Sequence, residues 1–239
     1  MKKILCVVTI IFLAGGFAFA QQDQQDQQDQ RETKDTAQQE FKTISVTKFE
    51  DAGYWKATIS GDEGLAVGRK LEGKPADKKA IPDEEAIGIT DVEIDDYVLG
   101  VKTMFFRRGA ATISVEPTRP IQLPGIVRSL SVWVVGRNYN HVLKAVFRDF
   151  DGHRFELTSI PGKLNFSGWK ELVVPIPEEI KQRDAHYSIL TGIEFLGFKI
   201  ECDMAETYGS YFLYFDEMRI RTDLFSERDR DQDDMLDAW

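Results

Sequence analysis

The sequence has few of the residues that mark catalysis or cross-linking. Its 239 residues contain two cysteines and three histidines, and 30 Lys and Arg stand against 40 Asp and Glu. A net charge of −10 argues against a nucleic-acid binder, which needs a positive field at the phosphates, and against docking on an anionic membrane surface. The 42% hydrophobic and 11% aromatic content excludes a collagen-like or wholly disordered chain. One domain with short appendages fits this length.

Recognisable catalytic motifs are missing as well. The histidines, His141, His153 and His186, lack metal-ligand spacing, and the chain has neither a G-x-S-x-G elbow nor a phosphate-binding loop. His141 and His153 flank one expected hairpin strand, and we interpret them as surface residues at turn ends. Carboxylates are abundant, but sequence cannot select a glycosidase pair. We therefore predict that the chain is not an enzyme.

The first twenty residues have the pattern of a cleaved signal peptide. Lys2 and Lys3 precede an apolar stretch over residues 4–17, and Ala18-Phe19-Ala20 supplies a cleavage signal. Cleavage would leave a soluble protein beginning at Gln21, with no membrane anchor and a net charge of −12 after the two lysines are lost. Cys202 would then be the only cysteine, so no internal disulfide can form. We expect a buried, inert thiol, and a disulfide between two chains is the alternative.

Two segments outside the expected domain are rich in polar or acidic residues. Residues 21–38 begin with a repeated Gln-Gln-Asp and predict a flexible arm. Residues 226–239 form an acidic tail whose start imitates a calcium loop, but Asp234 stands where that loop needs glycine. Met235, Leu236 and Trp239 are unusual in a solvated tail and suggest apolar anchors for another surface. The domain itself is assigned to residues 39–225.

The middle of the chain predicts β-structure. Short segments rich in β-branched and aromatic residues are bounded by Gly, Pro, Asn or Asp, and Asp151-Gly152 predicts a hairpin turn. Residues 61–82 are expected to form a long surface loop, and residues 177–183 a short connecting helix. The pattern predicts an all-β, two-sheet sandwich or jelly roll. The expected strands are residues 42–49, 54–59, 97–106, 111–116, 127–135, 142–149, 154–158, 170–174, 190–200 and 211–220.

A structural calcium site is one hypothesis for the carboxylates. Glu50 and Asp51 end the first expected strand, and Asp216 and Glu217 lie in the last one. The first and last strands of jelly rolls often lie side by side, so oxygens from Glu50 or Asp51 with Asp216 could hold Ca²⁺. The alternative is that these acids are solvated or paired with nearby Lys and Arg.

Aromatic residues suggest an interaction surface. The turn after Trp133 contains Arg137, Asn138 and Tyr139, and aromatic rings beside Asn and Arg suit a sugar-binding face or a protein interface equally well. Trp239 of the tail is a further candidate contact. Trp133 is flanked by valines, so we expect its ring to pack between the sheets or against a neighbouring subunit.

Eight stretches over residues 41–225 together resemble one family, the FlaA outer-layer, or sheath, proteins of the periplasmic flagellar filaments of spirochaetes. Their order and spacing are more specific than any one of them. The stretches are VLGVK (98–102), FRRG (106–109), PIQLPGIV (120–127), SVWVVGRNYN (131–140), RDFDG (148–152), LNFSGWK (164–170), YFD (214–216) and TDL (222–224).

This resemblance implies a β-sandwich similar to carbohydrate-binding modules and a non-catalytic structural subunit in the periplasm. The implied partners are a core flagellin filament, other sheath proteins and further copies of the chain, and the implied role is in filament shape and cell motility. A periplasmic carbohydrate-binding module is the alternative function, and a glycoside-active enzyme a third. The acidic tail and the Gln-rich arm are not features that the resemblance explains.

Overall fold

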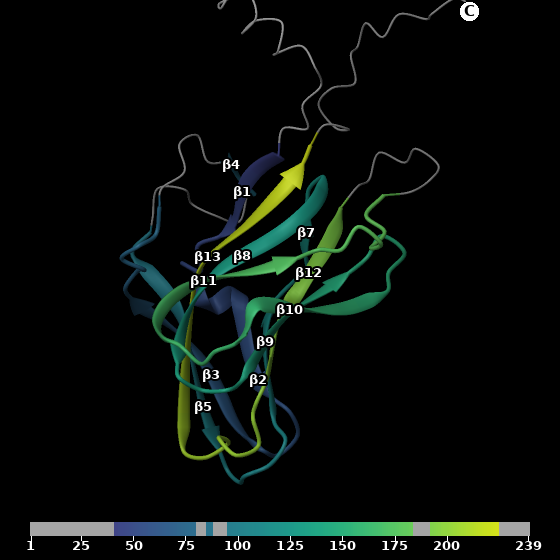
Figure 1. The fold of residues 1–239 in the computed structure, drawn as a ribbon. Helices are drawn as coiled ribbons and strands as arrows, with labels where there is room; N and C mark the ends of the chain where they lie inside the picture. Colours follow the sequence, from purple (N-terminus) through teal and green to yellow (C-terminus); the bar gives the residue numbers. More distant parts are fainter. Residues whose placement is uncertain (1–40, 80–84, 88–94, 184–191, 225–239) are drawn as a thin grey trace, which may run out of the picture. The chain divides into compact units, whose positions relative to one another are not determined.

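The computed structural model describes residues 41–79, 85–87, 95–183 and 192–224, and strands dominate this part of the chain (Figure 1). One short 3₁₀ helix, η1 (Ala52–Tyr54), interrupts them. The strands are β1 (Phe41–Thr47), β2 (Trp55–Ile59), β3 (Gly64–Glu72), β4 (Glu85–Ala86), β5 (Tyr97–Phe105), β6 (Thr112–Pro117), β7 (Ile121–Leu123), β8 (Ile126–Arg137), β9 (Val142–Arg148), β10 (Arg154–Lys163), β11 (Ser167–Pro175), β12 (Ile193–Glu201) and β13 (Ser210–Asp223). The all-β prediction is confirmed.

Several predictions concern residues beyond this described part. They are the signal peptide over residues 1–20, the arm over residues 21–38, the tail over residues 226–239, and the roles given to His186 and Trp239. The described strands all fall within the predicted domain of residues 39–225. No helix among the described residues is long and apolar enough to span a membrane.

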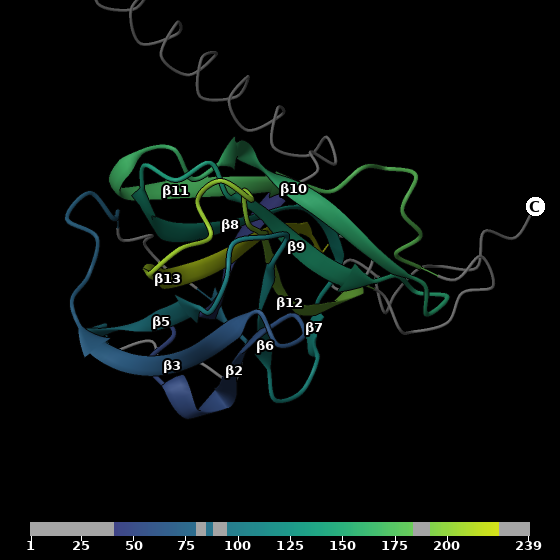
Figure 2. The same cartoon turned by 90° about the horizontal axis from the view of Figure 1, so that it is seen from below.

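The strands form two sheets that enclose one core (Figure 2). In sheet A, β11, β8 and β13 are neighbours, β5 and β1 share the other edge of β13, β3 pairs with β5, and β4 pairs with β1. In sheet B the order is β2-β6-β12-β9-β10, with β7 also on β12. A single pairing, Ile160 with Val173, links the two sheets between β10 and β11. The predicted adjacency of first and last strands is confirmed by the antiparallel pairing of β1 with β13.

Alternating burial along each strand places the core between the sheets. In β8, Leu130, Val132 and Val134 are fully buried. Across the core, the rings of Phe215 in β13 and Phe198 in β12 stack with centres 5.1 Å apart. Successive side chains of a strand point to opposite faces, so this pattern leaves the intervening residues on the outer face of each sheet.

The prediction of a loop over residues 61–82 is wrong for nearly half of this range, because residues 64–72 form strand β3. β3 pairs with β5 along nine residues, from Gly64 opposite Phe105 to Glu72 opposite Tyr97. Small residues conceal the strand, because Ala66 and Gly68 occupy positions that face the other sheet. Gly64 is required by packing, since a Cβ there would lie 2.2 Å from the carbonyl oxygen of Met104.

The predicted helix over residues 177–183 is also wrong. Residues 178–180 form a turn, in which the Ile180 N–H donates to the Pro177 carbonyl at 3.2 Å. Such a short segment gains little from helical hydrogen bonds. The buried Gln182 side chain instead bonds to both backbone groups of Val127 in β8, each at 2.8 Å. The hairpin turn at Asp151-Gly152 is confirmed, with Gly152 at a φ of 89°.

Candidate functional site

The outer face of sheet A is the main exposed apolar surface in the described strands. Leu65, Val67 and Leu71 of β3, Met104 of β5 and Phe212 of β13 are each 39% to 53% exposed. Soluble monomers seldom expose a contiguous apolar patch of this kind without a binding role. The surface is therefore a candidate interaction site.

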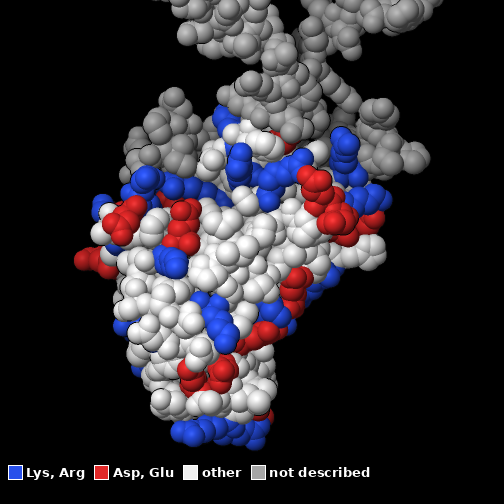
Figure 3. Space-filling model, viewed as in Figure 1, with Lys and Arg blue, Asp and Glu red and all other residues white. Residues whose placement is uncertain are grey.

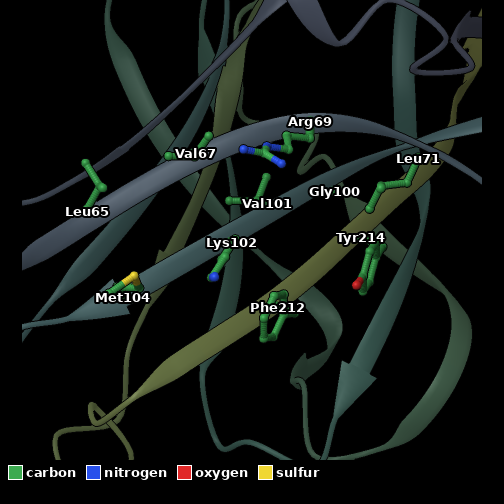
Figure 4. A pocket seen from close by; sticks show the side chains of 10 residues that line it. All are labelled: Leu65, Val67, Arg69, Leu71, Gly100, Val101, Lys102, Met104, Phe212 and Tyr214. Carbon is green, nitrogen blue, oxygen red and sulfur yellow. The ribbon is translucent and has the colours of Figure 1, made fainter.

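A groove runs across this face where β3, β5 and β13 lie side by side (Figure 4). Its volume is about 400 Å³. Gly100 forms part of its floor, because a Cβ there would lie 2.6 Å from Leu71 Cδ1 and 3.2 Å from Tyr214 Cε1. We call it the central groove, and its lining residues are Leu65, Val67, Arg69, Leu71, Gly100, Val101, Lys102, Met104, Phe212 and Tyr214.

A second hollow adjoins the central groove, since Tyr214 lines both. The Arg137 guanidinium carbon lies 5.4 Å from the centre of the Tyr214 ring. Gly136 keeps the floor low, because a Cβ there would lie 2.4 Å from the Phe166 carbonyl oxygen. We call this hollow the side pocket, and it is lined by Val135, Gly136, Arg137, Ser167, Gly168, Trp169 and Tyr214.

The charges in both hollows have one sign. Arg69 and Lys102 line the central groove, Arg137 lines the side pocket, and the lining of neither contains an Asp or Glu. Lys102 Nζ lies 5.6 Å from the centre of the Phe212 ring. A cation over an aromatic face keeps its charge, so these groups can still attract an anion. Figure 3 shows one side of the molecule, on which charged side chains surround a broad uncharged area.

The structure brings together only part of the predicted interaction set. Trp133 is half-buried on the outer face of sheet A, so the prediction that it packs between the sheets is wrong. Arg137 lies in the side pocket. Asn138 is exposed in a turn with a φ of 58°, and Tyr139 packs against His141 and Tyr211 at ring distances of 5.1 and 4.9 Å. Contact of Trp133 with a neighbouring subunit stays a prediction.

Sequence reasoning missed the residues that form the central groove. Leu65, Val67 and Leu71 alternate with smaller or polar residues, which is the signal of a strand with one apolar face. The expectation of a loop hid that signal. Phe212 and Tyr214 were assigned to a strand, but their face could not be chosen without the pairing of β13 with β5.

The predicted calcium ligands point to different partners. Glu50 Oε1 accepts the backbone N–H groups of Asp96 and Tyr97 at 2.9 and 3.1 Å. Asp51 Oδ1 accepts the Gly53 N–H at 2.9 Å. Asp216 faces Lys78. Within the described ranges no three His, Cys, Asp or Glu side chains are grouped as a metal site. Calcium binding therefore stays a prediction that the geometry does not favour.

A buried ionic cluster lies where β13 changes its neighbour from β5 to β1. Lys78 Nζ lies 3.1 Å from Asp216 Oδ2 and 3.0 Å from Glu217 Oε2, and it also contacts Asp95. Ser45 Oγ donates to Glu217 Oε1 at 3.0 Å. Burial raises the pKa of Asp216 to about 6, against the lowering effect of the Lys78 ammonium. The cluster lies at the register shift between Asp216 and Met218 of β13, and we interpret its role as structural.

The remaining candidate groups are separated. His141 is fully buried, so its prediction as a surface residue is wrong, and burial lowers its pKa despite nearby Glu206 and Asp203. His153 is exposed and pairs with Asp149, with Nδ1 and Oδ2 3.2 Å apart. The Cys202 thiol is free, and burial raises its pKa to about 12, in keeping with an unreactive thiol.

Comparisons with known proteins agree on a family. The family model described as flagellar filament outer layer protein FlaA matches residues 19–229. A Brachyspira hyodysenteriae protein, named as flagellar filament outer layer-like, is 36% identical over 194 residues, which are 81% of this chain and 85% of that protein. The flagellar filament outer layer protein of Treponema pallidum is 33% identical over 106 residues, 40% of this chain and 29% of that one.

Among solved structures, a study of carbohydrate-binding modules from the β-sandwich superfamily supplies one similar chain. It superposes with a TM-score of 0.46 and 10% identity, covering 71% of this chain and 57% of that chain. A likeness at this level carries no argument about ligand or function.

Proposed function

The chain belongs to the FlaA family of flagellar filament outer layer proteins, and from this premise we propose that it is a structural subunit of the sheath around the periplasmic flagellar filament. Family membership is the observation that carries the proposal. The predicted signal peptide supports export to the periplasm, where such a filament lies. The subunit would contribute to filament shape and so to cell motility.

The outer face of sheet A supports an assembly role. Its exposed aliphatic and aromatic side chains form a larger apolar surface than is usual on a monomer in water. They lie on strands rather than on loops. Many copies on one filament make weak contacts sufficient, because each added contact is effectively intramolecular. The proposed partners are the core flagellin filament, other sheath proteins and further copies of this chain.

We propose that the subunit works without catalysis. The described residues that line the central groove and the side pocket are apolar, aromatic, hydroxyl-bearing or cationic, and they include no histidine, cysteine or carboxylate. General acid–base catalysis uses such groups most often, and lysine and tyrosine less often. These hollows are suited to binding instead.

A carbohydrate-binding role is the alternative, and the side pocket is the observation that favours it. Trp169 and Tyr214 offer rings, and Arg137 and Ser167 offer donors, which is a combination that suits a sugar ring. The central groove beside it is less suited, because most of its lining is apolar.

Immunoelectron microscopy of purified periplasmic filaments tests the main proposal. An antibody against this chain should label the filament surface, and deletion of its gene should remove the label and alter filament shape and swimming. Unlabelled filaments, with the chain recovered only in the free periplasmic fraction, would contradict the sheath role. A glycan array on the purified protein, with Trp169→Ala as the comparison, tests the alternative.

A further inference from the structure

The central groove has the shape and charge of a receptor for an acidic, apolar peptide, and this chain contains one. We propose that the groove binds residues 226–239 of a neighbouring copy, so that sheath subunits join head to tail. The inference rests on the proposed sheath function and names one of its contacts.

Chemical complementarity is the first argument. From Asp229 onward the segment carries five Asp and a single Arg, with Met235, Leu236 and Trp239 among them. The groove presents aliphatic and aromatic side chains beside Arg69 and Lys102, and no carboxylate lines it. Attraction between the acidic segment and the cations of the groove speeds association, and burial of the apolar side chains of the segment stabilises the complex.

Position along β13 is the second argument. The groove lies near the beginning of this strand, where Met104 pairs with Ser210, whereas the acidic segment follows its end. Fourteen residues separate Ser210 from Leu224, a distance of roughly 46 Å at about 3.3 Å per residue. Eleven residues from Leu224 to Met235 span at most roughly 40 Å. At full extension Met235 therefore reaches the Tyr214 end of its own groove but falls short of the Ser210 end.

A neighbouring copy has no such restriction. If two copies are placed end to end along β13, the acidic segment of one meets the groove of the other. Such a contact joins two different surfaces, so it leaves a free groove and a free segment at the two ends. Repetition of a contact of this kind gives an open, helical assembly when the rotation does not close a ring, and an open helix is the geometry that a filament sheath requires.

A labelled peptide of residues 226–239 tests the contact directly. It should bind the full-length protein saturably in fluorescence anisotropy, more tightly at about 50 mM than at about 150 mM salt, because exposed charges are screened. The double variant Arg69→Glu with Lys102→Glu should weaken binding about tenfold or more. The matched control, Lys56→Glu with Arg154→Glu, reverses two exposed cations on the outer face of sheet B and should leave binding unchanged. Equal binding to all three proteins, or none to the wild type, would overturn the proposal.

A charge-swap mixture provides an independent test. The groove variant above, and a second variant with Asp229, Asp231, Asp233 and Asp234 replaced by Lys, should each lose self-association in analytical ultracentrifugation. Mixing the two should restore it, because each acidic segment then meets a basic groove and each basic segment an acidic one. Failure of the mixture to associate would contradict the pairing, and unchanged melting temperatures exclude misfolding.

These outcomes are separable from those for the sheath role. If the wild type labels filaments and the groove variant labels them equally, the sheath role stands and the groove contact is wrong. If the groove variant loses binding to purified core filaments but keeps the peptide, the groove faces the core filament instead. If the wild type never labels filaments, the sheath role itself fails, whatever the peptide does.

Discussion

The outer faces of the two sheets differ sharply, although their inner faces are alike. On sheet B the outward side chains form ion pairs: Lys199 Nζ lies 2.9 Å from Glu156, and Arg148 lies 2.8 Å from Glu194. On sheet A the outward positions of β3, β5 and β13 carry exposed Leu, Val, Met and Phe. Charged pairs suit contact with water, whereas exposed aliphatic groups favour a partner. The difference favours the outer face of sheet A for the interaction surface proposed above.

Charge is also distributed differently between the sheets. Sheet A buries Asp216 and Glu217 around Lys78, while the ion pairs of sheet B remain partly open to solvent. A buried carboxylate without its partner is expensive, but a screened surface pair contributes little. Charged residues therefore stabilise the strand register of sheet A, whereas on sheet B they mainly keep the outer face in contact with water.

Core substitutions should show that the two inner faces are equivalent. Phe215→Ala in sheet A and Phe198→Ala in sheet B should each reduce the free energy of unfolding by about 3–5 kcal/mol, because each leaves a large cavity. Phe212→Ala on the outer face should change it by less than about 1 kcal/mol. Urea unfolding measures all three. A cost for Phe212→Ala equal to that for Phe215→Ala would show that the outer face is already packed within the monomer.

Removal of Lys78, in the loop after β3, or of Lys199, in β12 of sheet B, should separate buried from exposed charge. Lys78→Met leaves Asp216 and Glu217 without their ammonium and should cost about 3 kcal/mol or more. Lys199→Met removes a surface pair and should cost less than about 1 kcal/mol. Thermal unfolding near neutral pH compares the two variants. Similar losses would mean that the Lys78 cluster is as well hydrated as the surface.

The pH dependence of stability should have opposite signs in the two sheets. The pKa of Asp216 is raised to about 6, so between about pH 4 and 6 the folded state holds a proton that the unfolded state has released. The stability that this proton contributes is therefore lost as the pH rises through about 4 to 6. Asp216→Asn should therefore gain about 3 kcal/mol relative to wild type across this window. Lys144 lowers the pKa of Glu201, so stability from that pair is lost as the pH falls. Glu201→Gln should therefore remove only the small loss of stability that this pair causes at acid pH.

Denaturant unfolding at several pH values between about 4 and 7 measures these differences. The decisive quantity is the gap between variant and wild type, since the other carboxylates are common to both. Parallel profiles for Asp216→Asn and wild type would show that Asp216 ionises normally in the folded protein.

An intermediate effect is expected at Trp133, which lies on the outer face of sheet A beside Asp216. Trp133 is only half-buried there, so Trp133→Ala should cost roughly 1–2 kcal/mol, well below the cost at a buried ring. Guanidinium chloride unfolding measures it. A loss of unfolding free energy equal to that of Phe215→Ala would show that the Trp133 ring is buried in the core. If sheath assembly falls more than stability does, the exposed ring contacts a neighbour.

Local patterns predicted much of the fold and little of the site. The alternation of Leu143, Ala145 and Phe147 with Lys144 placed β9 correctly, and Asp151-Gly152 placed its hairpin turn. β3 was missed because Gly64 and Gly68 resemble loop residues until their close approach to β5 and the core is seen. The interaction set was chosen around the turn after Trp133, whereas the groove lies mainly on β3, β5 and β13.

The sequence by itself determined the all-β class, most strand positions and the resemblance to the sheath family, because these depend on side chains that alternate or recur along the chain. Tertiary structure alone decided which face of sheet A stays open, and why Lys78 is buried. Lys78 and Asp216 are 138 residues apart, and Leu65 and Phe212 line one groove only because β3 and β13 flank β5. Contacts of this kind follow from strand order and register, and these are fixed by the packing of the whole core rather than by any local segment.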